Sequence, residues 1–518
     1  MHKLLKFLLL TIGAACHAAE GAVSAQPSVT VQDDSGCKAQ AGVLLLTVDG
    51  TRDLGPIKPM NAVNNGPNFS LDANKRQEQR GGHFVHYRNM RTPMARIHDS
   101  RNMASPPGHM GDINAIFPDW SADENDPKNY DFTLTDWQLH AIRLAGTEVM
   151  FRLGNSADQG PKQYGSADVP RDFGKWARVA ANVIRHYNEG WGWTNKVIPF
   201  ANQFNVRYWE IWNEADLGCP ADYFKNPKPY WKGKPRYWNG SPEQFFDFYA
   251  TVSKHLKTTF PALKIGGPAG VAAPHWTERF LAHCQTNAVP IDFFSWHTYA
   301  RTPEECVKKA AYVRRYLDRF GYTKTESVLN EWNWMKGWYG DEFRQAMRLR
   351  TSDNNYLMAA FYAAVMSAMQ DTSADMLMYY DARINTHYNA LFDQWKCLPL
   401  KAYYPFYAWA KLSDRGRQVA TGFRGERKGT WATAAKGADG SLAVYAARYT
   451  LDANATDTVI LKLAVKDRRI AKGFCHLVDE FNQYTEVPLA VMADGTAEID
   501  LRPNAFAFVE LRPDELLD

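Results

Sequence analysis

The stretch VRYWEIWNEADL, residues 206–217, is an apolar and aromatic run that ends abruptly in Asn213 and Glu214. β-Branched and aromatic residues at this density indicate a buried strand. A carboxylate at the end of such a strand has no packing role, and burying it without a partner is costly. We therefore interpret Glu214 as a functional acid.

A second stretch of the same kind, SVLNEWNW at residues 327–334, leads from apolar residues into Asn330 and Glu331. The two glutamates are 117 residues apart, which is three units of 39, a plausible length for one strand-helix unit of a (β/α)8 barrel. Side chains at the carboxyl ends of barrel strands meet on the catalytic face. The spacing therefore predicts a (β/α)8 barrel with a paired-carboxylate site, as glycoside hydrolysis requires.

The motifs WEIWNEADL, then SWHTY at 295–299, then SVLNEWNW together resemble glycoside hydrolase family 39. This family belongs to a clan of (β/α)8 glycosidases with catalytic glutamates on strands 4 and 7, and it holds β-xylosidases, α-L-iduronidases and bacterial exopolysaccharide hydrolases. The resemblance covers about residues 57–412 and includes MARIHDS at 94–100. One departure is Ala215, where the family usually has proline after the acid/base glutamate; it bears on the substrate more than on the mechanism.

The resemblance implies a retaining double displacement in which Glu331 is the nucleophile and Glu214 the acid and then the base. We expect burial near Trp209 and Trp212, together with the negative charge of Glu331, to raise the pKa of Glu214. Asn213 is expected to donate a hydrogen bond to the sugar 2-hydroxyl. No metal or organic cofactor is required.

Further site residues are carried over from the resemblance. It implies that Arg96 helps to hold the nucleophile, that His297 and Tyr299 line the cleft, and that Tyr380 binds substrate at the rim. His98, at the end of the predicted strand 94–98, is expected to contact sugar hydroxyls; the alternative is a satisfied rim histidine that never meets ligand.

Tryptophans gather near the predicted strand ends. Indole faces stack on the C–H faces of sugars, but tryptophan is also a large core residue, so we expect about half of this group to be packing. Trp332 is counted among the substrate-binding residues. A segment rich in proline, lysine and aromatics, 218–240, is either a lid or a structural excursion. The tryptophans are Trp209, Trp212, Trp296, Trp332, Trp334 and Trp338, and the candidate platforms of the lid are Tyr230, Trp231, Tyr237 and Trp238.

The order of motifs predicts a catalytic barrel over 57–412 and a smaller β-sandwich over 413–518, where short alternating runs are typical of antiparallel strands. A strand at 42–48, in the N-terminal segment 20–56, is expected to join this β-sandwich. The helix-start pattern of serine or threonine, proline and two acidic or amide residues occurs at Ser241 and at Thr302. The predicted barrel strands lie near 58–63, 94–98, 148–153, 206–212, 263–266, 291–296, 327–334 and 375–380, and the main helices at 134–144, 172–188, 355–370 and 404–412.

Composition limits the function classes. The chain of 518 residues has a net charge of +4 without a long basic run, which gives no indication of nucleic-acid binding. We expect a carbohydrate as the partner. No apolar run after the N-terminus approaches the roughly 18 residues of a membrane span.

The N-terminus predicts a signal peptide. Residues 1–19 have Lys3 and Lys6 before an apolar run and small residues, which predicts export to the periplasm or secretion. A less favoured alternative is lipidation at Cys16. Without Cys16 six cysteines remain, and export would permit a disulfide among them, although buried thiols are the favoured interpretation.

Two other functions remain open from the sequence. An enzyme of the same family could act as an exopolysaccharide endo-hydrolase or as an arabinosidase. A non-catalytic carbohydrate-binding barrel could also keep the aromatic platforms, but retention of both glutamates with His297 and Tyr299 favours catalysis. Whether the enzyme trims chain ends or cuts internally depends on the loop walls at 99–131 and 218–240.

Overall fold

The computed structural model describes residues 42–67, 83–100, 110–156, 168–198, 204–220, 222–225, 237–384 and 386–517. The predicted signal segment, Cys16 and Cys37 lie outside these residues. Among the described residues, Cys284, Cys306 and Cys475 are buried free thiols. In the described part of the chain, no helix has both the length and the apolar character needed to cross a membrane.

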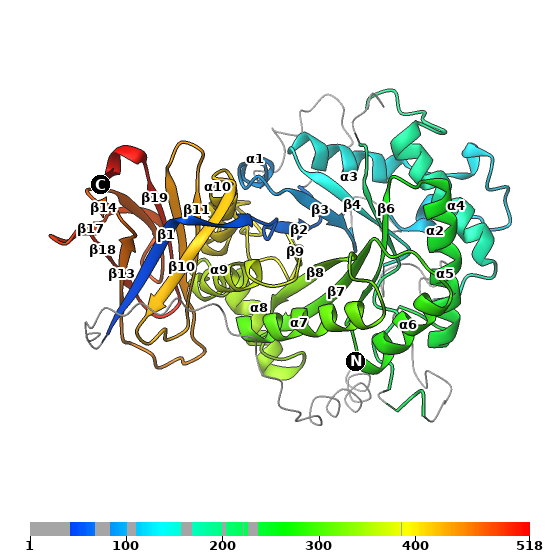
Figure 1. Cartoon of the computed structure of the whole chain (residues 1–518). Helices are drawn as coiled ribbons and strands as arrows, with labels where there is room; N and C mark the ends of the chain where they lie inside the picture. Colours follow the sequence, from blue (N-terminus) through cyan, green and yellow to red (C-terminus); the bar gives the residue numbers. More distant parts are fainter. Residues whose placement is uncertain are drawn as a thin grey trace.

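Eight parallel strands close into a barrel in chain order, since β9 returns to pair with β2. Figure 1 shows this barrel on the right, surrounded by helices. The predicted (β/α)8 barrel is therefore confirmed. Its strands are β2 (Ala62–Asn64), β3 (Met94–Ile97), β4 (Glu148–Leu153), β5 (Tyr208–Ile211), β6 (Lys264–Gly270), β7 (Phe293–Ala300), β8 (Glu326–Trp334) and β9 (Met376–Tyr379).

The first barrel strand starts later than 58–63, the range predicted from sequence. Pro56 and Pro59 lack the backbone N–H that a central strand donates, so the regular pairing begins only at Ala62. The other barrel strands lie within four residues of their predicted ends, and β4 has the predicted bounds.

Helices follow the barrel strands and cover the outside of the barrel. The helix-start pattern at Ser241 makes both reciprocal cap bonds with Gln244, as predicted, whereas Thr302 makes no side-chain cap. The helices are α1 (His83–Asn89), α2 (Ile113–Ile116), α3 (Thr133–Leu144), α4 (Phe173–Glu189), α5 (Pro242–Thr259), α6 (Pro274–Thr286), α7 (Pro303–Arg319), α8 (Gly340–Thr351), α9 (Tyr356–Gln370) and α10 (Tyr404–Ser413).

Most of the other described strands form one continuous ten-stranded sheet, on the left in Figure 1. The sequence predicts a β-sandwich here; the structure confirms a sheet-rich accessory region, in which residues from most of its strands share one apolar cluster. Its order is β16-β15-β19-β12-β11-β10-β1-β13-β18-β17, and β14 (Arg469–Ile470) pairs separately with β20 (Leu516–Leu517). The ten strands are β1 (Val43–Pro56), β10 (Arg417–Arg424), β11 (Thr430–Lys436), β12 (Leu442–Arg448), β13 (Val459–Val465), β15 (Phe474–Val478), β16 (Gln483–Pro488), β17 (Ala490–Val491), β18 (Ala497–Leu501) and β19 (Ala505–Leu511).

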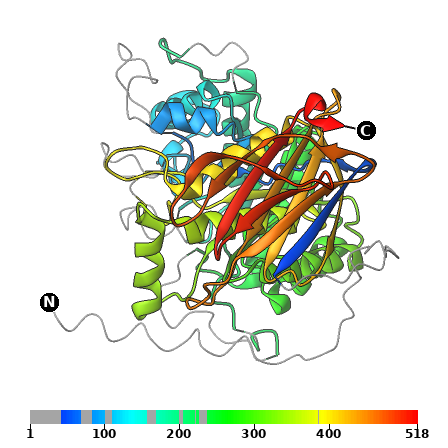
Figure 2. The same cartoon turned by 90° about the vertical axis from the view of Figure 1, so that its left-hand side faces the viewer.

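Strand β1 lies inside this sheet although it precedes the barrel in sequence. It pairs antiparallel with β10 and parallel with β13, and Figure 2 shows the blue strand among the orange ones. The predicted joining of residues 42–48 to the C-terminal sheet is confirmed. The domain limits at 56 and 412 stay a prediction.

Helix α9 joins the barrel to the sheet. All its residues from Met358 to Gln370 are buried, because one side contacts β8 and another contacts β11, β12 and β19. A helix that is apolar all round is typical of such a position between two layers. The side-chain amide of Gln370 completes the contact by donating to Gln418 on the sheet, at 2.8 Å.

Candidate active site

Glu331 reaches the barrel interior through an irregularity in β8. Val328 belongs to the cluster that fills the barrel, and strict alternation would send Asn330 inward and Glu331 outward. The pairing with β7 shifts by one residue between Leu329 and Glu331, as in a β-bulge. Both Asn330 and Glu331 consequently contact groups inside the barrel.

Glu214 follows β5 in an uncommon backbone conformation. Its φ is 47°, and that of Trp212 is 72°, both in the left-handed region that side chains other than glycine rarely adopt. Such conformations persist where surrounding contacts impose them, and they cluster at functional sites. Here the backbone N–H of Glu214 donates to the carbonyl of Ala269 at 2.8 Å.

Asp216 fastens the segment of Glu214 to the loop after β6. Its buried carboxylate accepts the backbone N–H groups of Val271 at 2.9 Å and Ala273 at 3.2 Å. Gly270 lies against this carboxylate, where an added Cβ would be 2.8–2.9 Å from three atoms of it. The close approach requires glycine.

Gly270→Ala is therefore expected to destabilise the protein by about 1–3 kcal/mol, because overpacking forces the Asp216 contact apart. The measurement is denaturant unfolding, and kcat should fall as well because the segment of Glu214 shifts. Gly422→Ala is the control, since its Cβ would meet nothing within 4 Å. Equal stability of both variants would contradict the role given to Asp216.

His297 brings the two glutamates together. Its Nδ1 lies 2.7 Å from Oε1 of Glu214 and 3.4 Å from Oε2 of Glu331. One oxygen of each glutamate and one nitrogen of His297 all lie within 4.8 Å of one another. Burial lowers the pKa of His297 to about 4, although the charge of Glu331 opposes this, so the imidazole is neutral at pH 7.

Arg96, on β3, contacts both Glu331 and Asn213 through its guanidinium group. Its Nη1 lies 3.4 Å from Oε2 of Glu331, and its Nη2 donates to the side-chain oxygen of Asn213 at 2.6 Å. Its Nε donates to Glu210, a fully buried carboxylate on β5, also at 2.6 Å. The predicted contact of Arg96 with Glu331 is therefore present, and Glu210 fixes the guanidinium that makes it.

Tyr299, on β7, donates from its hydroxyl to Oε1 of Glu331 at 2.5 Å. His98 lies on the other side, with Nε2 3.9 Å from Oε2 of Glu331. Tyr380 follows β9 and faces His98, with ring centroids 6.1 Å apart. The structure thus brings the predicted residues His98, Tyr299 and Tyr380 to one site with Glu331.

Several polar atoms of this site are buried and have no hydrogen-bond partner among the described residues. They include Nδ2 of Asn213, Nδ1 of His98 and Nε2 of His297. Unpaired buried donors are costly, so a native protein keeps few of them without a reason. A ligand rich in hydroxyl groups would satisfy them, and a sugar is such a ligand.

The carboxylates of Glu214 and Glu331 share one proton near neutral pH. Burial and, to a smaller extent, the charge of Glu214 raise the pKa of Glu331 to about 7, against the opposing effects of His297 and Arg96. In such a coupled pair the value belongs to the last proton that the pair loses. Because Arg96 and Tyr299 stabilise the charge on Glu331, we place this proton on Glu214.

Glu214, His297 and Glu331 are also the right residue types for binding a metal ion, and their spacing would permit it. However, the guanidinium of Arg96 already places a permanent positive charge 3.4 Å from Glu331, which opposes a second cation. The hydroxyl of Tyr299 also points its proton at Glu331. We therefore assign the cluster to acid–base chemistry.

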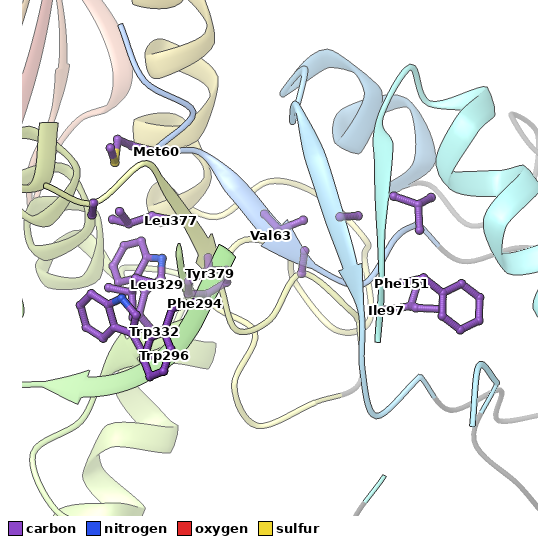
Figure 3. Close-up of a cluster of buried hydrophobic side chains, with 14 of the residues drawn as sticks. Met60, Val63, Ile97, Phe151, Phe294, Trp296, Leu329, Trp332, Leu377 and Tyr379 are labelled. Atoms are coloured by element: carbon purple, nitrogen blue, oxygen red, sulfur yellow. The ribbon is translucent and has the colours of Figure 1, made fainter. Parts of the chain in front are cut away.

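The prediction that Trp332 binds substrate is wrong. Trp332 is fully buried on the outer side of β8, where its ring centroid lies 5.5 Å from that of Tyr362 and 5.9 Å from that of Tyr379. Figure 3 shows it among Leu329, Trp296 and Tyr379 in the apolar cluster. The residue after an inward-pointing glutamate on a strand points outward, and here that side packs on helices α9 and α10.

The other tryptophans are packing residues to a larger extent than predicted. Trp338 is 45% exposed, and its ring lies 4.9 Å from that of Tyr299, but the rest of the group is buried. Trp209 stacks on Phe151 outside the barrel, so it does not surround Glu214. In the lid segment Trp238 packs edge-on against Trp212, whereas Tyr230 and Trp231 lie outside the described residues. The buried members of the group near the strand ends are Trp209, Trp212, Trp296, Trp332 and Trp334.

Sequence reasoning missed three polar residues of this site. Glu210 could have been found, because a charged residue inside the predicted buried strand 206–212 requires a buried partner. Asn64 donates to the backbone carbonyl of Asn330 and accepts from Arg96, a contact visible only in three dimensions. Asp99 follows His98 directly and lies beside Tyr380, with 3.2 Å between Oδ2 and the tyrosine hydroxyl.

Comparisons with known proteins agree with the glycosidase-like geometry of the site. The family model described as glycosyl hydrolases family 39 matches residues 112–372. A β-xylosidase of Geobacillus stearothermophilus is 28% identical over 138 residues, which is 26% of this chain. The matched segment spans only 22% of the length of that relative.

Solved structures resemble the chain over nearly its whole length. A glucosidase from Croceicoccus marinus superposes with a TM-score of 0.66 at 20% identity, covering 91% of this chain and 99% of that one. A monomeric β-xylosidase from Caulobacter crescentus gives 0.62 at 14% identity, with 90% and 99% covered. At these identities the likeness establishes the arrangement of barrel and sheet alone.

Proposed function

Because this chain belongs to glycosyl hydrolase family 39, we propose that it is a retaining glycoside hydrolase that cleaves β-xylosides or closely related glycosides. The observation that carries the proposal is the approach of Glu214 and Glu331, whose nearest oxygens lie within 4.8 Å. Retaining enzymes hold their carboxyl groups about 5–5.5 Å apart, whereas inverting ones need about 6.5–9.5 Å to admit a water.

In the first step Glu331 attacks the anomeric carbon and forms a covalent glycosyl ester. The bond to the leaving oxygen breaks with its electron pair on that oxygen, which takes the proton from Glu214. Tyr299 and Arg96 orient Glu331 for the attack. Asn213, whose Nδ2 has no partner among the described residues, donates to the 2-hydroxyl of the reacting sugar.

In the second step a water replaces the leaving group. Glu214 is now ionised and takes a proton from this water, whose oxygen attacks the anomeric carbon and releases Glu331. Esterification has removed the charge of Glu331, so the repulsion that favoured a protonated Glu214 is gone. One residue therefore acts as acid and then as base.

The choice of β-xyloside rests on the relatives, since both the Geobacillus and the Caulobacter proteins are β-xylosidases by name. The test is a panel of aryl β-D-xylosides, β-D-glucosides, α-L-arabinosides and α-L-iduronides, together with bacterial exopolysaccharides. Release of a β-configured product from a β-xyloside, followed by NMR, would support the proposal. Turnover with inversion, or none on any member, would refute it.

The pH profile should fall on its alkaline side near pH 7. The last proton of the carboxylate pair is lost near the raised pKa of Glu331, about 7, and the pair must keep one proton for acid catalysis. We therefore expect kcat/KM to decline about tenfold per pH unit above this value. The measurement is kcat/KM against pH with an unactivated alkyl xyloside. In Glu214→Gln this limb should disappear, and its persistence there would assign it to another group.

We also propose export of the mature protein to the periplasm or medium, supported by the signal-like residues 1–19. Cell fractionation with the native N-terminus tests this proposal. Recovery of the full-length chain in the cytoplasmic fraction would contradict it.

A further inference from the structure

A third carboxylate, Asp99, lies beside the catalytic pair. It follows β3 and His98, in a left-handed conformation with φ 49°. Nε2 of His98 lies 3.5 Å from Oδ2 of Asp99 and 3.9 Å from Oε2 of Glu331, so this nitrogen lies between the two acids. Tyr380 donates to the same Oδ2 at 3.2 Å. Asp99 therefore belongs to the same site, on the side formed by β3 and β9.

The second oxygen of Asp99 has no partner. Oδ1 is buried and accepts no hydrogen bond from the described residues, while Nδ1 of the adjacent His98 is equally unpaired. A carboxylate can accept several hydrogen bonds, and an oxygen that is buried without a hydrogen bond costs free energy of desolvation. Like Nδ2 of Asn213, this oxygen is an available contact for a hydroxyl group of a ligand.

The charges around the site disfavour an anionic sugar. The nearby arginines each face a carboxylate: Nη2 of Arg152 contacts Asp112 at 2.7 Å, although its Nε and Nη1 have no partner among the described residues, and Arg383 contacts Asp381 at 2.6 Å. Arg96 is likewise paired with Glu210. The carboxylates left to face a ligand are the ionised Glu331 of the catalytic pair and Asp99, and both repel a second carboxylate in an environment of low dielectric constant.

We propose that Asp99 accepts a hydrogen bond from a ring hydroxyl of the reacting sugar and thereby selects neutral pyranosides over uronosides. This inference rests on the proposed function and adds the substrate class to it. Arg383 supports the geometry, since it donates to the backbone carbonyl of Asp99 and to Asp381. Asp99 is thus a specificity-determining residue that takes no part in proton transfer.

The test removes each partner of the expected hydrogen bond in turn, the Asp99 carboxylate by substitution and the sugar hydroxyl by a deoxy analogue. Wild type and Asp99→Asn are assayed with an aryl β-D-xyloside and with its 3-deoxy and 4-deoxy analogues. In wild type, one deoxy analogue should lose about 10–100-fold in kcat/KM, as expected for a hydrogen bond to a charged group. Asp99→Asn should lose a similar factor on the parent substrate, and its penalty for the deoxy analogue should fall to about 2–3-fold.

The preference for neutral over anionic substrates is measured in the same proteins. Wild type should prefer the xyloside to the matching aryl uronoside by at least about 100-fold in kcat/KM, and Asp99→Asn should narrow this ratio about tenfold. Asp119→Asn is the control, because this exposed aspartate accepts hydrogen bonds from Ser121, outside the catalytic site. It should behave as wild type on every substrate.

An unchanged deoxy penalty in Asp99→Asn would overturn the inference while leaving the proposed function intact. If wild type turned over none of the glycosides, the proposed function would fail instead. Titration calorimetry, which measures the dissociation constant of a xylose-configured imino sugar, then tests the Asp99 contact independently of turnover. A dissociation constant that rises about tenfold or more in Asp99→Asn supports the contact, and an unchanged one refutes it.

Discussion

Replacing Glu331 by glutamine is expected to lower kcat by at least about 10⁴-fold on every substrate, because no other group can form the glycosyl ester. Glutamine keeps the size of the side chain and can still accept from Tyr299. KM should change little, since the contacts to sugar hydroxyls remain. The measurement is steady-state kinetics with an activated aryl β-xyloside, which detects low residual rates.

The same variant should be at least as stable as wild type at pH 7. Burial and mutual repulsion raise to about 7 the pKa at which the pair of Glu214 and Glu331 loses its last proton, so folding disfavours the doubly ionised pair at every pH above the unfolded value. Glutamine removes this unfavourable contribution, which is largest above pH 7 and vanishes at low pH. Thermal unfolding at pH 5 and pH 8 should show the difference between variants growing with pH.

Glu326→Gln is the matched control, because Glu326 lies on the same strand at the opposite end of the barrel. There it contacts Lys264 and accepts from Tyr208, far from the catalytic face. This variant should keep kcat within about threefold. Comparable activity of Glu331→Gln and wild type would exclude Glu331 as the nucleophile.

Glu214→Ala should affect substrates according to their leaving groups. A poor leaving group needs the proton of Glu214, so kcat/KM for alkyl xylosides should fall by about 10²–10⁴-fold. An activated aryl leaving group departs without a proton, so its glycosyl ester should form readily and accumulate. A burst of released phenol followed by slow turnover is the expected time course.

Azide should rescue this variant. The missing carboxylate leaves space beside the glycosyl ester, and an anion can attack there without a general base. The expected product is a β-glycosyl azide, identified by NMR, because two displacements restore the configuration. Glu243→Ala, which changes an exposed acidic residue in the first turn of α5, should show neither burst nor rescue. An α-azide would contradict the double displacement.

Much of the barrel could be predicted from local patterns. Apolar runs in the sequence indicate buried strands. The spacing of 117 residues predicts that Glu214 and Glu331 are three strands apart, as β5 and β8 are. The apolar run at residues 42–48 also predicts a strand that joins the C-terminal sheet, and β1 lies in that sheet.

The errors came from features that a linear pattern does not contain. Trp332 was assigned to substrate because it adjoins Glu331, but neighbours on a strand face opposite sides. The pKa of Glu331 depends on its burial, on Arg96 and on the charge of Glu214 together. No local pattern indicates Asp99, because only the tertiary contacts show that one of its oxygens has no hydrogen-bond partner among the described residues.

The sequence alone determined the architecture and the two glutamates, because hydrophobic periodicity and strand-end carboxylates are properties of short segments. Only the tertiary structure decided which way these side chains face. A one-residue shift in the pairing of β7 and β8 turns Glu331 inward, and a left-handed backbone aims Glu214 at His297. Register and burial arise from contacts between distant segments, and these contacts set the separation of the carboxylates and the protonation of the pair.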